Sequence, residues 1–197
     1  MNLVSRALLI SVLLAGSAQA AAPAAPAWIV AQCQSSAGQS QEDFLLQVGA
    51  VAYAWTGETG FEACGVLGRH EDGRWSMVLT TNRSQVQCQF HDRQRLPGAQ
   101  ATPEQLHTHP DVGPDGIIEV LPETRDYARL MGDTRLEEVT HIRLSNQQRL
   151  SSTDLQVGGG YLATGGRLFH GGSTDARTQD LGALPEQANP SVCQRTR

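Results

Sequence analysis

The run Leu106-His107-Thr108-His109-Pro110 constrains the fold of this chain more than any other stretch. Alternate side chains of an extended strand point to the same face, so His107 and His109 can reach one metal ion. Pro110 has no N–H to give to a neighbouring strand, so we expect the strand to end there. Imidazole nitrogen binds zinc at ~2.0–2.1 Å, and a catalytic zinc site needs three protein ligands and one open position. The run therefore predicts a strand that carries two metal ligands and requires a third from elsewhere.

Residues 1–20 have the features of a secretory signal. Arg6 is the charged start, residues 7–15 form a short apolar core, and the small residues Ala18 and Ala20 frame a cleavage site. The chain after the signal has no apolar run long enough to span a membrane. We therefore expect an exported protein, periplasmic or secreted, without stable membrane insertion.

The remaining chain is long enough for one domain with a buried core. We expect a loose, Ala- and Pro-rich N-terminal tether over 21–40, a main domain over 41–171, and a polar C-terminal tail over 172–197. The formal net charge of the full chain is −5. A nucleic-acid-binding protein needs a basic surface, so this charge argues against nucleic acid as a partner.

Four cysteines follow the signal, at Cys33, Cys64, Cys88 and Cys193. An even number of cysteines in an exported chain predicts two disulfides, for which three pairings are possible. Pairing Cys64 with Cys88 and Cys33 with Cys193 would staple a central hairpin and tie both ends of the domain together. A cysteine zinc site is the alternative, but the chain has no C-x-x-C pair.

The periodicity of apolar residues predicts alternating helices and strands. Apolar residues recur three or four positions apart over 41–55, which is typical of a helix. Two β-prone runs, 64–67 and 75–80, flank the turn-forming pair Asp72-Gly73 and predict a hairpin. Further expected strands cover 86–90, 104–109, 139–144, 161–164 and 167–170, and a second helix runs from Pro122 to near Gly132. This order predicts an α/β fold with a single mixed sheet flanked by helices.

Two more motifs flank the histidine pair in sequence. Glu62 begins the run Glu-Ala-Cys-Gly upstream of it, and Ser151 and Asp154 form Ser-x-x-Asp downstream of it. With His107 and His109, and in this order, the motifs resemble the JAMM (MPN-type, Mov34-like) zinc metallopeptidases over most of the chain that follows the signal. The resemblance implies a JAMM/MPN-like, cytidine-deaminase-like sandwich around the sheet.

The resemblance also implies a role for each motif residue. His107, His109 and Asp154 would bind Zn²⁺ and leave a fourth position for a water whose pKa zinc lowers to about 7. Glu62 would take the proton of this water and pass it to the leaving amine. Ser151 would donate a hydrogen bond to the oxyanion of the intermediate, which is worth ~10²–10³ in rate. The implied reaction is hydrolysis of an amide bond.

The third metal ligand has two candidates, because the family places Ser-x-x-Asp close behind His-x-His and this chain does not. Asp126 closes a nearer Pro-x-x-x-Asp outline, but Glu123 stands there in place of the serine. Asp154 keeps Ser151 and leads directly into a glycine-rich predicted strand, so we prefer it. Residues 111–150 are then an insertion that can cover or shape the cleft.

Glu58 and His170 are further candidates for the site. Glu58 is an alternative to Glu62 as the general base, although its expected position is a solvated turn. His170, at the end of a predicted strand, could line the cleft.

Three functions are consistent with these residues. The first is an exported zinc-dependent hydrolase of a peptide or isopeptide bond, with a peptide or protein substrate. The second is a noncatalytic binding or assembly module that keeps the fold. The third is a metal-scavenging site, which gives Glu62 and Ser151 no task and therefore ranks last.

Overall fold

The fold is described by a computed structural model that covers residues 26–90, 95–144, 149–151, 154, 159–172 and 178–196. The expected signal sequence, residues 1–20, lies outside the described residues. No helix in these ranges has both the length and the apolar character needed to cross a bilayer.

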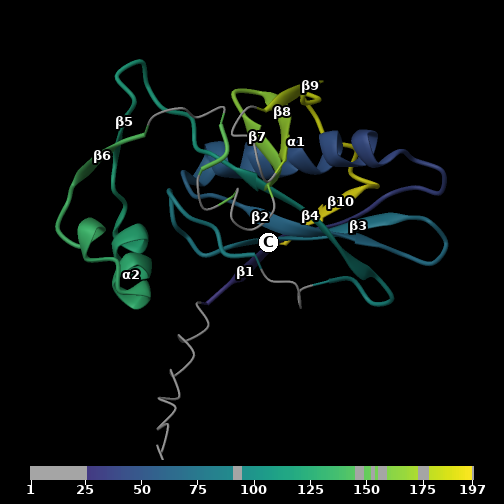
Figure 1. The fold of residues 1–197 in the computed structure, drawn as a ribbon, viewed down its shortest axis with the longest axis horizontal. Coiled ribbons are helices and arrows are strands. Elements are labelled where there is room, and N and C mark those ends of the chain that lie inside the picture. The colour runs from purple at the N-terminus through teal and green to yellow at the C-terminus, as the bar shows by residue number, and fades with distance from the viewer. Residues whose placement is uncertain are drawn as a thin grey trace, which may run out of the picture.

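Eight strands form one mixed sheet, which Figure 1 shows at the centre of the molecule. Every neighbouring pair is antiparallel except β4 and β7, which run parallel. The spatial order of the strands is β10 (Cys193–Arg195), β1 (Trp28–Gln34), β3 (Trp75–Thr81), β2 (Cys64–Arg69), β4 (Gln100–Thr108), β7 (Gly159–Thr164), β8 (Arg167–Gly172) and β9 (Gln179–Ala183). The expectation of an α/β fold with one large mixed sheet is confirmed.

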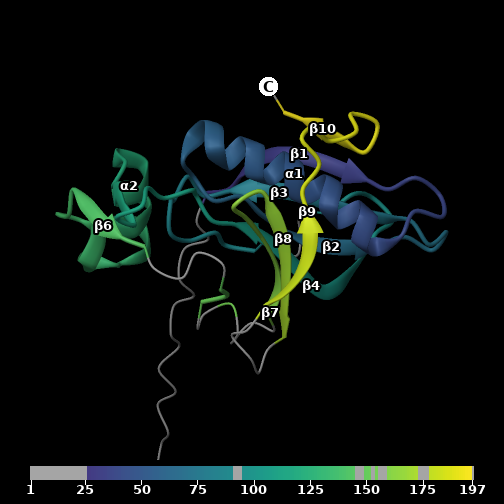
Figure 2. The ribbon, with the colours of Figure 1, turned by 90° about the horizontal axis from the view of Figure 1, so that it is seen from above.

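Helix α1 (Gln41–Thr59) lies along one face of this sheet, as Figures 1 and 2 show from two directions. The Ser40 side chain accepts a hydrogen bond from the Asp43 N–H at 3.0 Å and so caps the first turn. Gly60 ends the helix in the left-handed conformation, with φ of 78°. The main core lies between α1 and the sheet and includes Phe44, Leu45, Val48, Leu67, Leu79, Leu106, Ala163 and Leu168.

A smaller unit stands beyond the end of the main sheet in both views (Figures 1 and 2). Strands β5 (Ile117–Glu119) and β6 (His141–Arg143) pair antiparallel, and helix α2 (Pro122–Met131) with the 3₁₀ turn η1 (Thr134–Leu136) connects them. We call residues 117–143 the β5–α2–β6 unit. It forms most of the segment 111–150 that the motif spacing marked as an insertion.

The structure corrects the predicted bounds of the domain at both ends. Part of the predicted tether 21–40 forms β1, which pairs with both β3 and β10. The predicted irregular tail 172–197 contributes the edge strands β9 and β10. Local sequence gave no sign of β1 and β10 because their pairing partners lie far away along the chain. β9 pairs with nearby β8, but its sequence has no alternating apolar pattern.

The predicted strand over 86–90 is also wrong, because this stretch is a loop. The Gln89 N–H donates to the Asn82 side-chain oxygen at 2.7 Å instead of to a neighbouring strand. A disulfide fastens the same loop at Cys88. We call residues 82–90 the cleft loop.

Both disulfides have the pairing that we considered first. Cys33 on β1 bonds Cys193 directly opposite on β10, with an S–S distance of 2.07 Å. Cys64 on β2 bonds Cys88 with an S–S distance of 2.04 Å. With all four cysteines bonded, a cysteine zinc site is excluded. The two disulfides are compatible with export from the cytoplasm.

Candidate metal centre

The alternation of side chains along β4 places His107 on the sheet face opposite α1. Its neighbours Leu106 and Thr108 are fully buried on the α1 side. The Thr108 hydroxyl contacts the Thr56 hydroxyl of α1 at 2.6 Å and accepts the Ala63 N–H at 2.9 Å. These bonds fix the end of β4, so the direction of the His107 ring is set by the strand itself.

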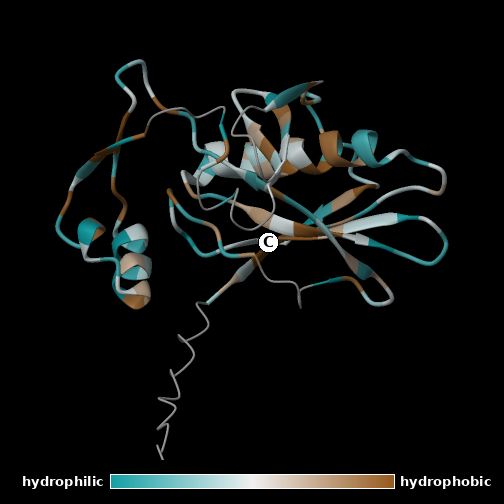
Figure 3. Ribbon diagram, viewed as in Figure 1, coloured by the Kyte–Doolittle hydropathy of each residue, from teal (hydrophilic) through white to brown (hydrophobic). Residues whose placement is uncertain are grey.

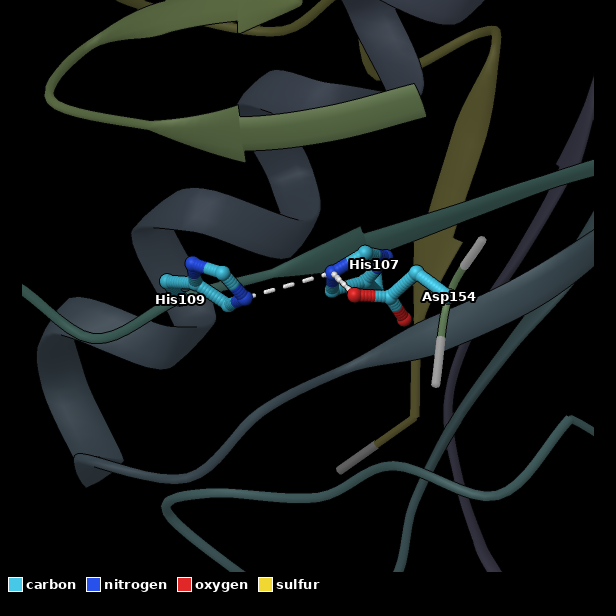
Figure 4. Close-up of side chains that lie close together, drawn as sticks. All are labelled: His107, His109 and Asp154. Carbon is cyan, nitrogen blue, oxygen red and sulfur yellow. Dashed lines mark hydrogen bonds and ion pairs between the residues drawn. The ribbon is translucent and has the colours of Figure 1, made fainter. Parts of the chain in front are cut away.

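His107, His109 and Asp154 converge on one point, as Figure 4 shows. One ligand atom from each residue lies within 4.8 Å of the other two. The two Nε2 atoms of the histidines are 3.3 Å apart, and the Nε2 atom of His107 is 3.6 Å from Oδ2 of Asp154. Ligand atoms ~2.0–2.1 Å from a tetrahedral zinc are separated by about 3.3–3.4 Å. The three residues therefore fit a divalent metal such as zinc in both chemistry and spacing.

Two of the three candidate ligands, His109 and Asp154, are also held by backbone hydrogen bonds. The His109 N–H donates to the Ala163 carbonyl of β7 at 3.4 Å, which fixes the chain just after β4. The Ser151 N–H donates to Oδ2 of Asp154 at 2.7 Å. Such outer bonds orient metal ligands and are part of the affinity of a metal site.

Burial keeps the His107 ring neutral. The pKa of His107 falls from 6.5 to about 4, mainly because the ring is buried and further because His109 is near, while Asp154 opposes the shift. Metal ligation requires a neutral imidazole. His107 is therefore ready to bind a metal at neutral pH.

Glu62 lies just before β2 and is only 6% exposed. Its backbone is held on both sides, because its N–H donates to the Ser84 carbonyl at 2.8 Å and its carbonyl accepts the Thr81 hydroxyl at 2.8 Å. Burial raises the pKa of the Glu62 carboxyl well above 4.5, and the negative charge of Asp154 raises it further. A buried carboxyl with a raised pKa beside a metal group is typical of a general acid or base.

A cleft of about 790 Å³ contains the whole group. Glu62, His107, His109, Ser151 and Asp154 line one side of it, so the structure brings all five predicted site residues together. The cleft loop and the β5–α2–β6 unit form the other side. Their metal-binding and catalytic roles stay predictions.

The alternative site residues lie elsewhere. Asp126 is on α2 with a side chain 72% exposed and pairs with Arg129 at 2.9 Å. Glu58 lies in the last turn of α1, not in a separate turn, and pairs with Arg195 at 2.6 Å. His170, which we named as a residue that could line the cleft, does not line it. It stacks on Tyr161 at 4.5 Å, on the α1 side of the sheet.

Sequence reasoning missed several residues of the cleft. Tyr127 of α2 lines it and is 5% exposed, and its hydroxyl has no hydrogen-bond partner among the described residues. Burial and the nearby Glu62 carboxylate raise the pKa of Tyr127. Gln105 also lines the cleft, and its side chain donates to the Gly159 carbonyl at 2.8 Å. The alternation along β4 places Gln105 beside His107 and was the available signal, whereas nothing in the sequence marked Tyr127.

The fold and the site define an α/β protein with a candidate divalent-metal centre in a cleft. No family model, curated protein or solved structure matches this chain. The resemblance to the JAMM metallopeptidases stays a prediction from the sequence motifs.

Proposed function

We propose that this chain is an exported, JAMM-like zinc hydrolase that cleaves a peptide or isopeptide bond. One observation carries the proposal. The ligand atoms of His107, His109 and Asp154 meet at distances of 3.3 and 3.6 Å in a cleft that also contains Glu62 and Ser151. Two disulfides and a predicted signal over 1–20 support export.

His107, His109 and Asp154 are the residues that would hold the metal. Zinc bound there would supply Lewis acidity and a nucleophilic water at neutral pH. The neutral state of His107 favours this ligand set, because its lowered pKa keeps a proton off the ring. The carboxylate of Asp154 supplies the negative charge that stabilises a dication.

Glu62 would move the proton. Its carboxylate accepts a proton from the attacking water and delivers it to the nitrogen of the leaving amine. An ordinary glutamate is too weak a base to hold that proton near neutral pH. The raised pKa of Glu62, caused by burial and by Asp154, therefore matches the task.

Ser151 would stabilise the oxyanion of the tetrahedral intermediate. Its Oγ atom accepts the Asp154 N–H at 3.2 Å. A serine hydroxyl has one donor and two acceptor sites, so this bond leaves its O–H able to donate to substrate. Removal of one such donor typically costs ~10²–10³ in rate.

A noncatalytic binding module is the second candidate. Ile117 and Leu130 of the β5–α2–β6 unit are 38% and 44% exposed, and a partner that covered them would remove this apolar area from water. The buried Glu62 has no task in such a module. We therefore prefer the hydrolase.

The variant Glu62→Gln distinguishes the hydrolase from the noncatalytic binding module. We expect it to bind zinc like the wild type but to hydrolyse a defined mixture of synthetic peptides at least about 10²-fold more slowly, because the proton acceptor is lost. Glu58→Gln is the matched control, since Glu58 is exposed and lies outside the cleft. A wild type that binds zinc but cleaves no peptide of the mixture would contradict the hydrolase and favour the binding module. Cleavage by Glu62→Gln at the wild-type rate would show that Glu62 is not the proton acceptor.

A further inference from the structure

The cleft has two chemically different sides. One side, formed by β4 and its neighbours, carries the candidate metal centre. The facing side consists of the cleft loop and of α2, η1 and β6 from the β5–α2–β6 unit, and it mixes apolar residues with Asp133, Arg135 and Arg143. Figure 3 shows the apolar stretch of β6. Clefts of ~300–1,000 Å³ with mostly apolar walls and a few placed polar groups are typical small-ligand sites.

The facing side presents a row of half-buried apolar side chains to the cleft. Each retains some exposed area, and apolar surface gains roughly 25 cal/mol per Å² when it leaves water. A ligand with an apolar group therefore gains free energy by covering them. We call this row the apolar wall, and it consists of Val86, Phe90, Met131, Leu136, Ile142 and Leu144.

Buried Gln85 fixes the apolar wall relative to the metal centre. Its Oε1 atom accepts the Leu121 N–H at 2.7 Å and the Thr124 hydroxyl at 3.1 Å, while its Nε2 atom donates to the Glu119 carbonyl at 3.0 Å. Gln85 belongs to the cleft loop, which the disulfide at Cys88 ties to β2 beside His107. Because both sides are tied to one body, the width of the cleft is set before a ligand binds.

We propose that the substrate is a peptide with a large apolar side chain next to the bond that is cleaved, and that this side chain packs on the apolar wall. This inference rests on the proposed hydrolase function. Asp133, Arg135 and Arg143 also line the cleft and can pair with charged groups of a substrate. A polar group placed against the apolar wall itself would stay unpaired, which costs free energy. An apolar residue pairs with the wall while the peptide bond lies at the metal centre.

Amino-acid hydroxamates test this preference without knowledge of the natural substrate. The hydroxamate group chelates zinc and places the amino-acid side chain beside the metal. We would titrate the zinc-loaded protein by calorimetry with the N-acetyl hydroxamates of glycine, leucine, phenylalanine and aspartate. We expect the leucine and phenylalanine compounds to bind at least about tenfold more tightly than the glycine compound, and the aspartate compound to gain nothing.

Two neighbouring residues of α2 give matched variants. Met131 lines the cleft, whereas Leu130 is 44% exposed and lies outside it. We expect Met131→Ser to reduce the leucine-over-glycine affinity ratio severalfold and Leu130→Ser to leave that ratio unchanged. Ile142→Ser, on β6, is a second wall variant with the same expectation in case Met131→Ser does not fold.

The possible failures are distinguishable. A protein that binds zinc and the glycine hydroxamate but shows no preference for apolar side chains would overturn this inference and leave the proposed function standing. A protein that binds neither zinc nor any of the four compounds would overturn the proposed function, and this inference with it.

Discussion

Ser151 and Asp154 cap each other. The Ser151 N–H donates to Oδ2 of Asp154 at 2.7 Å, and the Asp154 N–H donates to Oγ of Ser151 at 3.2 Å. This reciprocal pair has the form of a capping box, which orders a turn by satisfying two backbone donors at once. The same Oδ2 atom lies 3.6 Å from Nε2 of His107. The serine therefore holds the third candidate ligand in place, in addition to any role toward substrate.

Removal of the Ser151 hydroxyl should consequently weaken metal binding as well as catalysis. We expect Ser151→Ala to lower zinc affinity about tenfold, because the hydroxyl accepts the Asp154 N–H and so holds the backbone that carries this candidate ligand, although the bond from the Ser151 N–H to Oδ2 remains. Ser151→Thr keeps the hydroxyl and should retain zinc binding. Competition titration against a chelator of known affinity measures both. Equal affinities in Ser151→Ala and the wild type would show that the cap does not position Asp154.

Glu62 should make the metal-free protein less stable as pH rises. Its pKa is raised on folding, so the folded state holds a proton that the unfolded state has lost above pH 4.5. The free energy of unfolding is then highest below pH 4.5 and falls as pH rises toward the raised pKa, with a slope of at most about 1.4 kcal/mol per pH unit.

The Glu62→Gln variant isolates this effect from that of His107, whose lowered pKa acts below pH 6.5 in the opposite direction. We expect metal-free Glu62→Gln to be more stable than the wild type at pH 8, with a difference that shrinks as pH falls. Urea unfolding at several pH values in EDTA measures the difference. A gap between the two proteins that does not change with pH would contradict the assignment of the raised pKa to Glu62.

Removal of each disulfide should lower the free energy of unfolding by a different amount. In the chain-entropy picture, a crosslink over a separation of 160 residues stabilises by about 5 kcal/mol and one over 24 residues by about 3.5 kcal/mol. We therefore expect the Cys33→Ser/Cys193→Ser double variant to lose more stability. Thermal unfolding compares the two double variants.

Zinc affinity should depend more on the Cys64–Cys88 disulfide than on the Cys33–Cys193 disulfide. Cys64 stands opposite His107 in the register of β2 and β4, and Cys88 lines the cleft. The Cys64→Ser/Cys88→Ser variant should bind zinc more weakly, whereas Cys33→Ser/Cys193→Ser, far from the cleft, should bind it normally when folded. Equal zinc affinities in the two variants would mean that the cleft loop does not support the site.

Tyr127 offers a test of whether a buried hydroxyl in the cleft lacks a hydrogen bond. Its buried hydroxyl has no hydrogen-bond partner within the described ranges, and a buried unsatisfied polar group costs roughly 1–3 kcal/mol. We expect Tyr127→Phe to raise the free energy of unfolding by about 1 kcal/mol. Tyr53→Phe is the control, because the Tyr53 hydroxyl donates to the Asp111 carboxylate and its removal should destabilise. A destabilised Tyr127→Phe protein would show that the hydroxyl is satisfied in solution.

The elements that could be predicted from the sequence are those that local contacts stabilise. The hairpin of β2 and β3 follows from Asp72-Gly73, and α1 follows from its apolar spacing, although it extends to Thr59. The strands β1 and β10 were not predictable in this way, because each pairs with a distant segment. β9 pairs with nearby β8, but no apolar alternation marks it as a strand. The stretch 86–90 alternates like a strand, yet Gln89 bonds Asn82 and Cys88 bonds Cys64, so tertiary contacts decide its shape.

The candidate site also has residues that local sequence could predict and residues that it could not. The pair His107 and His109 could be placed from the end of β4 alone, and the family motif suggested Asp154 and Glu62. The apolar wall could not be predicted, because periodicity shows that Met131 lies on a helix but not which body that helix faces. The periodicity places Leu130 and Met131 on the same side of the helix, whereas of these two only Met131 lines the cleft.

The most direct measurement is the zinc stoichiometry of the purified protein and two aspartate variants, by elemental analysis after dialysis at neutral pH. We expect one zinc per chain in the wild type and in Asp126→Ala, and loss of the zinc in Asp154→Ala. A wild type without zinc, or a loss of zinc in Asp126→Ala with retention in Asp154→Ala, would contradict the metal centre described above.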